Sequence, residues 1–256
     1  MSILKSSNPT LSEKMWNRAD GNIQAIGTET MTVRGAINKF GFLLLLVIGA
    51  AVYTWNLHAQ FADSTMNTLM MVGIFGGLVV AIVISFKPTL APFLAPLYAI
   101  LEGFFLGGIS VMFNTMFADK YPGLIMQAVG LTFGVAIAMF LLYNFRIIKV
   151  TDKLRSVIIS ATMGILLFYV ITIVLRLFHV NVGFTYDSSL LGIGISLFIV
   201  AIAALNLLLD FDMIERGAAG GAPKFMEWYG AFGLMVTIVW LYLEILRLLS
   251  KLSSRN

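Results

Sequence analysis

Seven long runs of apolar residues, separated by short polar segments, dominate the pattern of the chain. They cover roughly residues 37–57, 68–86, 94–117, 123–145, 155–178, 188–212 and 227–249. Each is close to the ~20 residues that a helix needs to cross about 30 Å of hydrocarbon. Backbone groups in lipid must be satisfied internally, and the runs are too long and too evenly apolar for the alternating strands of a membrane barrel. The pattern predicts an all-α, polytopic membrane protein with seven transmembrane helices.

The polar ends of the chain set the expected domain organisation. Residues 1–36 have mixed charge, are too long for a secretory signal and are followed by no small-residue cleavage pattern. We therefore expect a cytoplasmic N-terminal tail over residues 1–36, one seven-helix domain over residues 37–249 and a C-terminal tail over residues 250–256. Within the helices, two GxxxG patterns, Gly103 with Gly107 and Gly130 with Gly134, are typical of close helix packing.

The composition excludes several classes of protein. Apolar residues make up 59% of the chain and charged residues 12%, whereas soluble domains have about 45–50% and about 25%. A water-soluble enzyme, a disordered protein and a nucleic-acid binder are therefore excluded. The absence of cysteine excludes disulfides and thiolate metal sites.

The net charge of +4 carries information mainly about orientation. With the N-terminus in the cytoplasm, 12 of the 17 Lys and Arg residues fall on the cytoplasmic side and 5 outside, as the positive-inside rule favours. We therefore expect a multi-pass protein of the cytoplasmic membrane with a cytoplasmic N-terminus. Arg247, Lys251 and Arg255 would fall outside, so a last segment that re-enters and returns is the alternative to a seventh crossing.

Acidic residues within the apolar runs are the strongest functional signal. Glu102 lies in the third run, Asp210 late in the sixth and Glu244 in the seventh, while Asp212 and Glu227 lie near run ends. An ionised carboxylate at mid-membrane costs on the order of 2.5–3.5 kcal/mol on insertion scales. These acids must therefore be protonated, paired, hydrated or bound to a cation.

Helical spacing predicts a shared polar interior. Asp210 lies on one helix face with Asn206, and Glu244 shares a face with Thr237, while Glu102 belongs to a looser polar stripe. Two neighbouring carboxylates titrate as a unit, which makes a proton-operated switch. Carboxylate oxygens also suit Ca²⁺, which takes 6–8 oxygen ligands, so Asp210 and Glu244 form a candidate site for weak calcium binding.

Simpler structural roles stay open for each acid. Glu244 can pair locally with Arg247, Asp210 and Asp212 can belong to a solvated helix end, Glu102 can be a buried protonated acid, and Glu227 can anchor the interface. No HExxH, GxSG or glycine-rich phosphate motif is present. We therefore expect no enzymatic activity and no cofactor, with Ca²⁺ only as a permeating ion.

Five stretches spread over almost the whole chain resemble the Bax-inhibitor (transmembrane Bax-inhibitor-motif) family, specifically its longer bacterial branch. They are SSNPTLSEK, MTVRGAINKFGFLLLL, APFLAPLYAILEGFFLGGIS, LNLLLDFDMIERG and EWYGAFGLMVTIVWLYLEILRLLSKL. The resemblance implies a seven-helix fold with the last helix central, and a pH-sensitive calcium leak.

The resemblance also implies roles for individual residues. Asp210 matches the sixth-helix acid and Glu244 the seventh-helix acid of a proton-sensing pair that gates the pore, and Glu102 matches the acid of an EG-x-x-L element. The two paired acids are further apart in this sequence than in the family, so Glu227 or Asp212 is an alternative partner, and the third run has no arginine to latch the pair.

The intramembrane acids and the family resemblance are compatible with three functions. The first is a calcium leak channel gated by the intramembrane acids, with the lipid bilayer, Ca²⁺ and protons as partners and no nucleic acid. The alternatives are a proton-coupled secondary transporter and a regulatory membrane protein that acts through a membrane-protein partner.

Overall fold

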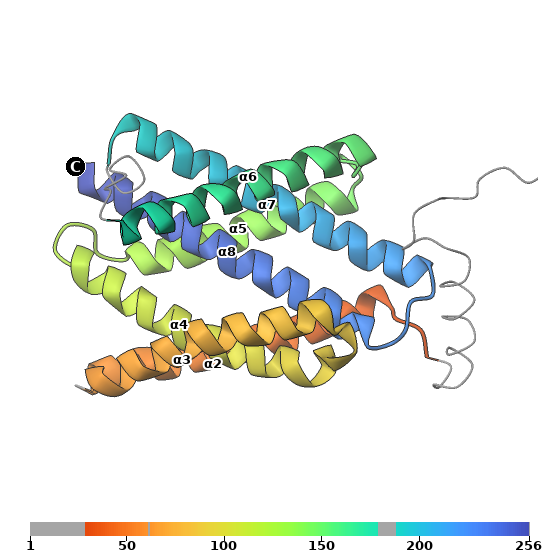
Figure 1. Ribbon diagram of the computed structural model, residues 1–256, viewed down its shortest axis with the longest axis horizontal. Helices are drawn as coiled ribbons and strands as arrows, with labels where there is room; N and C mark the ends of the chain where they lie inside the picture. Colours follow the sequence, from red (N-terminus) through yellow and green to blue (C-terminus); the bar gives the residue numbers. More distant parts are fainter. Residues whose placement is uncertain (1–28, 61, 179–187, 256) are drawn as a thin grey trace, which may run out of the picture.

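The computed structural model describes residues 29–60, 62–178 and 188–255 (Figure 1). Within this part of the chain, seven helices are long and apolar enough to cross a membrane. They are α2 (Val33–Ala59), α3 (Asp63–Phe86), α4 (Ala91–Phe117), α5 (Leu124–Asn144), α6 (Asp152–Leu177), α7 (Leu190–Ala219) and α8 (Met226–Arg255), with a short 3-10 helix, η2 (Pro88–Leu90), before α4. The prediction of an all-α protein with seven transmembrane helices is confirmed.

The first and last helices extend beyond their predicted ends. Helix α2 begins at Val33 because Thr32 caps it, accepting a hydrogen bond from the Gly35 amide at 2.9 Å. Residues 33–36 therefore belong to the first span, and residues 1–28 of the predicted tail lie outside the described residues. Helix α8 continues to Arg255, so most of the predicted C-terminal tail is helical.

Helix α8 lies at the centre of the molecule. In Figure 1 it runs diagonally between one group formed by α2, α3 and α4 and a second formed by α5, α6 and α7, and it packs against α2, α4, α5 and α7. Of its most apolar stretch, 56% is buried, compared with 28% for α3 and 17% for α6. The expected central position of the last helix is therefore confirmed.

Helix α8 crosses the whole bundle. It starts at the end of the bundle where α2 begins, and its C-terminus lies at the opposite end (Figure 1). The alternative of a re-entrant last segment is therefore wrong. Two of the basic residues that suggested it have partners inside the protein: Arg247 contacts Glu244, and the buried Lys251 donates to the Gly192 carbonyl at 3.0 Å. They are therefore not free loop charges of the kind that the positive-inside rule counts.

Candidate functional site

The predicted acids divide into two sets according to their partners. Asp212, Glu227 and Glu244 are buried and bound by Lys or Arg side chains. Asp210 and Glu102 each have one buried carboxylate oxygen that accepts no hydrogen bond within the described chain. Because an unpaired charge in an apolar interior is costly, the second set holds the acids whose charge is least stabilised by the protein.

Glu244 lies in α8 within a polar cluster shared with α6. Its Oε1 accepts hydrogen bonds from the Tyr169 hydroxyl at 2.8 Å and from Arg247 at 3.0 Å. Arg247 also donates to the Tyr169 hydroxyl and stacks over its ring, 5.2 Å from the centroid. A small cavity of about 20 Å³, lined in part by Ser196 and Lys251, adjoins this cluster. The expected local pairing of Glu244 with Arg247 on α8 is therefore present, and the Tyr169 hydroxyl of α6 strengthens it.

Asp212 holds the start of α6 against the end of α7. Its Oδ2 pairs with Arg155 and, at 2.8 Å, with Arg216 one turn further along α7. Only 7% of Asp212 is exposed, so it is not part of a solvated helix end. Nearby, Glu215 bonds Arg146 at the end of α5, and this hydrogen bond raises the pKa of Arg146. Ion pairs therefore link α5, α6 and α7 at this end of the bundle.

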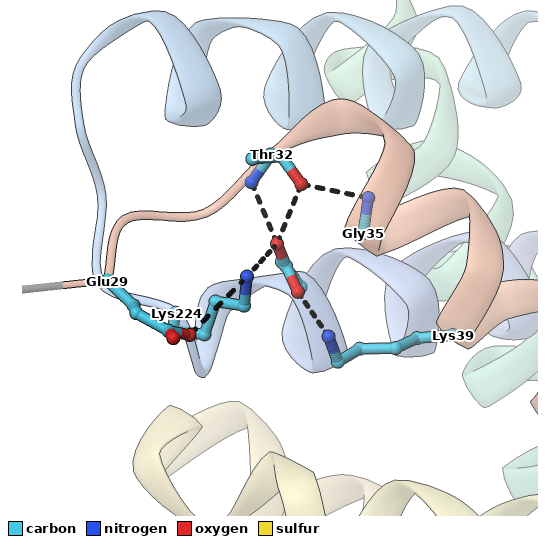
Figure 2. A network of polar contacts seen from close by, with 6 residues as sticks. Glu29, Thr32, Gly35, Lys39 and Lys224 are labelled. Atoms are coloured by element: carbon cyan, nitrogen blue, oxygen red, sulfur yellow. Dashed lines mark hydrogen bonds and ion pairs between the residues drawn. The ribbon is translucent and has the colours of Figure 1, made fainter.

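Glu227, in the first turn of α8, lies at the centre of the polar network in Figure 2. Its Oε1 accepts from the amide and the hydroxyl of Thr32, at 2.8 and 3.0 Å. Its Oε2 binds Lys39 of α2, and Lys224 lies 3.4 Å from Oε1 and 3.7 Å from Glu29. Because Glu227 is fully buried, it ties the N-terminal ends of α2 and α8 together instead of anchoring a surface.

Asp210, in α7, faces α8. Its side chain lies beside Thr237, and its Oδ1 lies 3.7 Å from the position that a Cβ on Gly233 would occupy. One turn earlier, Asn206 donates to the Thr162 hydroxyl of α6 at 2.8 Å. The predicted polar face of α7 therefore exists, with Asn206 directed to α6 and Asp210 to α8, and no cation contacts Asp210 in the described chain.

Glu102, in α4, faces α3. Its Oε1 lies 3.2 Å from the position of a Cβ on Gly77, so the glycine makes room for the carboxyl group. Tyr98, one turn earlier, lies beside Glu102, and its ring packs edge-on against Phe232 of α8 with centroids 4.9 Å apart. Glu102 thus lies at the contact between α3 and α4, one turn from a contact with α8, and forms no ion pair with any described residue.

The structure does not join Asp210 to Glu244 by a hydrogen bond or an ion pair in its described part. Asp210 lies beside Thr237 of α8, which precedes Glu244 by seven positions, or about 10.5 Å along the helix. The carboxyl group of Asp210, on α7, therefore faces a different level of α8 from the one that carries Glu244. Among the described residues, no three His, Asp or Glu side chains cluster as metal ligands.

Several binding partners of the acids were not predicted as site residues. From the sequence, Lys39 and Arg155 indicate only orientation, and Tyr169 lies in an apolar run that contains no candidate acid. Each of these three side chains ends in a polar group and lies at or within an apolar run. Because polar groups in lipid need partners, this feature could have identified them as site residues. The sequence does not show which acid each one meets.

One comparison with known proteins matches the chain. A family model described as Bax inhibitor 1 like matches residues 8–254, almost the entire length. No curated protein matches it. The match includes all five candidate acids and all seven helices except the last residue of α8.

Proposed function

The chain belongs to the Bax inhibitor 1 like family, and from this premise we propose that it is a pH-sensitive leak for cations, Ca²⁺ in particular. The observation that carries the proposal is that two half-buried acids, Asp210 and Glu102, each have one buried oxygen without a hydrogen-bond partner, and neither forms an ion pair within the described part of the chain. The proposed activity is passive movement of an ion and includes no chemical step.

Protons control the leak through Asp210. In the arrangement described, α7 and α8 pack around its carboxyl group, and one oxygen has neither protein partner nor cation. The neutral, protonated acid fits this packing at low cost, whereas an ionised one costs several kcal/mol unless water or a cation reaches it. Loss of the proton therefore favours a hydrated, loosened α7–α8 contact, so flux rises with pH.

We expect Asp210 and Glu102 to bind a permeating cation only weakly. Asp210 and Glu102 lie on different helices, and the described residues provide no cluster of ligands for a resident metal. A Ca²⁺ ion at either carboxylate keeps most of its water, since it takes 6–8 oxygen ligands. Weak binding suits passage, because an ion that is held tightly does not leave. The carboxylate of Glu244 is already bound by Arg247, so it contributes negative charge to the interior but is not a free ligand for the ion.

We propose that the protein lies in the cytoplasmic membrane with its N-terminus in the cytoplasm. The end of the bundle where α2 begins contains Lys39, Arg155, Arg216 and Lys224, together with Arg146. Basic residues concentrate on the cytoplasmic side of membrane proteins. The loop between α2 and α3 at the other end has no Lys or Arg.

Calcium flux in vesicles tests the proposal. Purified protein is reconstituted into liposomes that contain a calcium-sensitive dye, and flux is recorded between about pH 6 and about pH 8. We expect passive flux that rises with pH in the wild type and stays low at all pH values for Asp210→Asn, which mimics the protonated acid. Asp119→Asn, the same change at an exposed loop position, is the matched control and should keep the wild-type profile.

Two results would contradict the proposal. Wild-type vesicles that pass no more calcium than protein-free vesicles at any pH would exclude the leak. A pH profile of Asp210→Asn identical to that of the wild type would exclude Asp210 as the proton sensor. Uptake that saturates and requires a proton gradient would instead indicate a secondary transporter.

A further inference from the structure

We propose that a lateral cavity between α2 and α5 binds one acyl chain of a membrane phospholipid. This inference does not depend on the proposed ion leak. The cavity has a volume of about 540 Å³ and is lined by residues of α2, α4, α5 and α8. Helix α2 packs on α4 and α8, and α5 packs on α7 and α8, so the cavity occupies the space that these contacts leave between α2 and α5.

The walls of the cavity are almost entirely apolar. Two of its polar groups, the hydroxyls of Ser110 and Tyr242, hydrogen-bond to each other at 2.7 Å and need no ligand. An apolar cavity of this kind does not hold water well; a much smaller one, of about 150 Å³, stays dry and takes up benzene. At the same volume per carbon atom as benzene in that smaller cavity, the cavity of about 540 Å³ has room for roughly 20 carbon atoms, the size of one acyl chain.

The surroundings of the cavity determine the occupant. All four helices that line it are membrane-spanning helices, so the molecules that reach it come from the bilayer. On its α2 side, Ile48 and Val52 line the cavity and are 43% and 53% exposed, which leaves it open to lipid. Filling it restores the dispersion contacts that an empty space lacks.

One end of the cavity carries a polar anchor at the depth of the membrane surface. Trp55, near the end of α2, and Gly123, at the start of α5, line this end together with Asn114. No hydrogen bond joins the Asn114 amide to any other described residue. An amide beside an apolar tube at this depth suits the ester group of a phospholipid whose chain enters the tube.

A photo-crosslinking experiment tests the assignment. The full-length protein is reconstituted in phosphatidylcholine vesicles doped with a phosphatidylcholine that carries a diazirine near the end of one acyl chain, and labelled peptides are mapped. Val239 of α8 lines the cavity and is only 6% exposed, so an acyl chain reaches it only from inside the cavity. We expect labelling of this segment of α8.

Matched variants separate the cavity from the lipid-facing surface. Ile48→Trp fills the cavity and should reduce labelling of α8 several-fold. Leu45→Trp, one turn earlier on α2, lies outside the cavity and is 70% exposed, so labelling should not change. Asn114→Leu should also reduce labelling of α8. Labelling of Ile137, a lipid-facing residue of α5, reports that each variant is folded in the bilayer.

Three outcomes would overturn the assignment. The first is wild-type protein labelled at Ile137 but not on α8. The second is labelling of α8 that persists in Ile48→Trp, which would place the chain elsewhere. The third is equal labelling of α8 in Asn114→Leu and the wild type, which would remove the ester anchor and with it the phospholipid as the occupant.

Discussion

The ring of Tyr98 stands edge-on against the ring of Phe232, with centroids 4.9 Å apart. Glu102 follows Tyr98 by one turn on α4, and Phe232 precedes Gly233, the α8 position next to Asp210. The helix turn that holds Glu102 therefore contacts, through Tyr98, the segment of α8 that faces Asp210. A movement of α8 at this depth changes the surroundings of Asp210 and displaces Tyr98 beside Glu102.

The first prediction concerns the close contact between α2 and α4. A Cβ on Gly103 would lie 2.5 Å from both the Val47 carbonyl oxygen and the Ala50 Cβ, closer than packed atoms approach. Gly103→Ala must therefore separate the two helices, and we expect a loss of about 1–3 kcal/mol in the free energy of unfolding. Thermal unfolding in a mild detergent measures it.

Gly130→Ala is the matched control for this prediction. Gly130 begins the other GxxxG pattern, but a Cβ there meets nothing within 4 Å, so alanine should be neutral or slightly stabilising because of its higher helix propensity. Equal destabilisation by the two substitutions would contradict the account of how α2 and α4 pack.

The second prediction concerns the buried network around Glu227. Lys39→Met removes the cation that binds Oε2 and leaves a fully buried carboxylate with Thr32 and the more distant Lys224. Because a buried charge that loses a partner is costly, we expect about 1–3 kcal/mol of destabilisation. The melting temperature of the purified protein measures the loss.

A double variant shows whether the cause is charge. Adding Glu227→Gln to Lys39→Met removes the buried negative charge, so the double variant should regain part of the stability that the single variant loses. If the double variant is less stable than the sum of the two single effects predicts, the network does not act through the charge of Glu227.

The third prediction concerns the hydroxyl that links α6 to α8. Tyr169→Phe keeps the ring but removes the hydrogen bonds to Glu244 and Arg247, and we expect the unfolding free energy to fall by about 1–3 kcal/mol. Tyr53→Phe, at an exposed position in α2, is the control and should leave stability unchanged. A wild-type melting temperature for Tyr169→Phe would show that Glu244 is satisfied without α6.

Much of the fold could be predicted from the sequence because the bilayer imposes simple rules. Helix number and approximate ends follow from the length of the apolar runs. The details of packing do not follow, as the glycine patterns show: Gly103 is packed against α2, whereas Gly130 contacts nothing within 4 Å. A GxxxG pattern identifies a face that can pack closely, and only the arrangement of the other helices decides whether it does.

The candidate site could be predicted in part for a related reason. The cost of charge in lipid is sufficient to single out Asp210, Glu244 and Glu102 from the sequence. Their partners lie far away in the chain, as Tyr169 does from Glu244, so spacing along one helix cannot identify them. Spacing along the last run puts Thr237 on the face of Glu244, but in the structure Thr237 lies beside Asp210 and its hydroxyl donates to the Gly233 carbonyl.

The state of the Asp210 carboxyl group in the membrane tests the central claim most directly. Protein with isotopically labelled aspartate is reconstituted in vesicles, and infrared difference spectra between the wild type and Asp210→Asn isolate the carboxyl band of Asp210. We predict a protonated acid at the pH values where the calcium flux is low, which becomes a carboxylate over the same range in which the flux rises. A carboxylate already present where the flux is low, or an acid that stays protonated while the flux changes, would contradict the account.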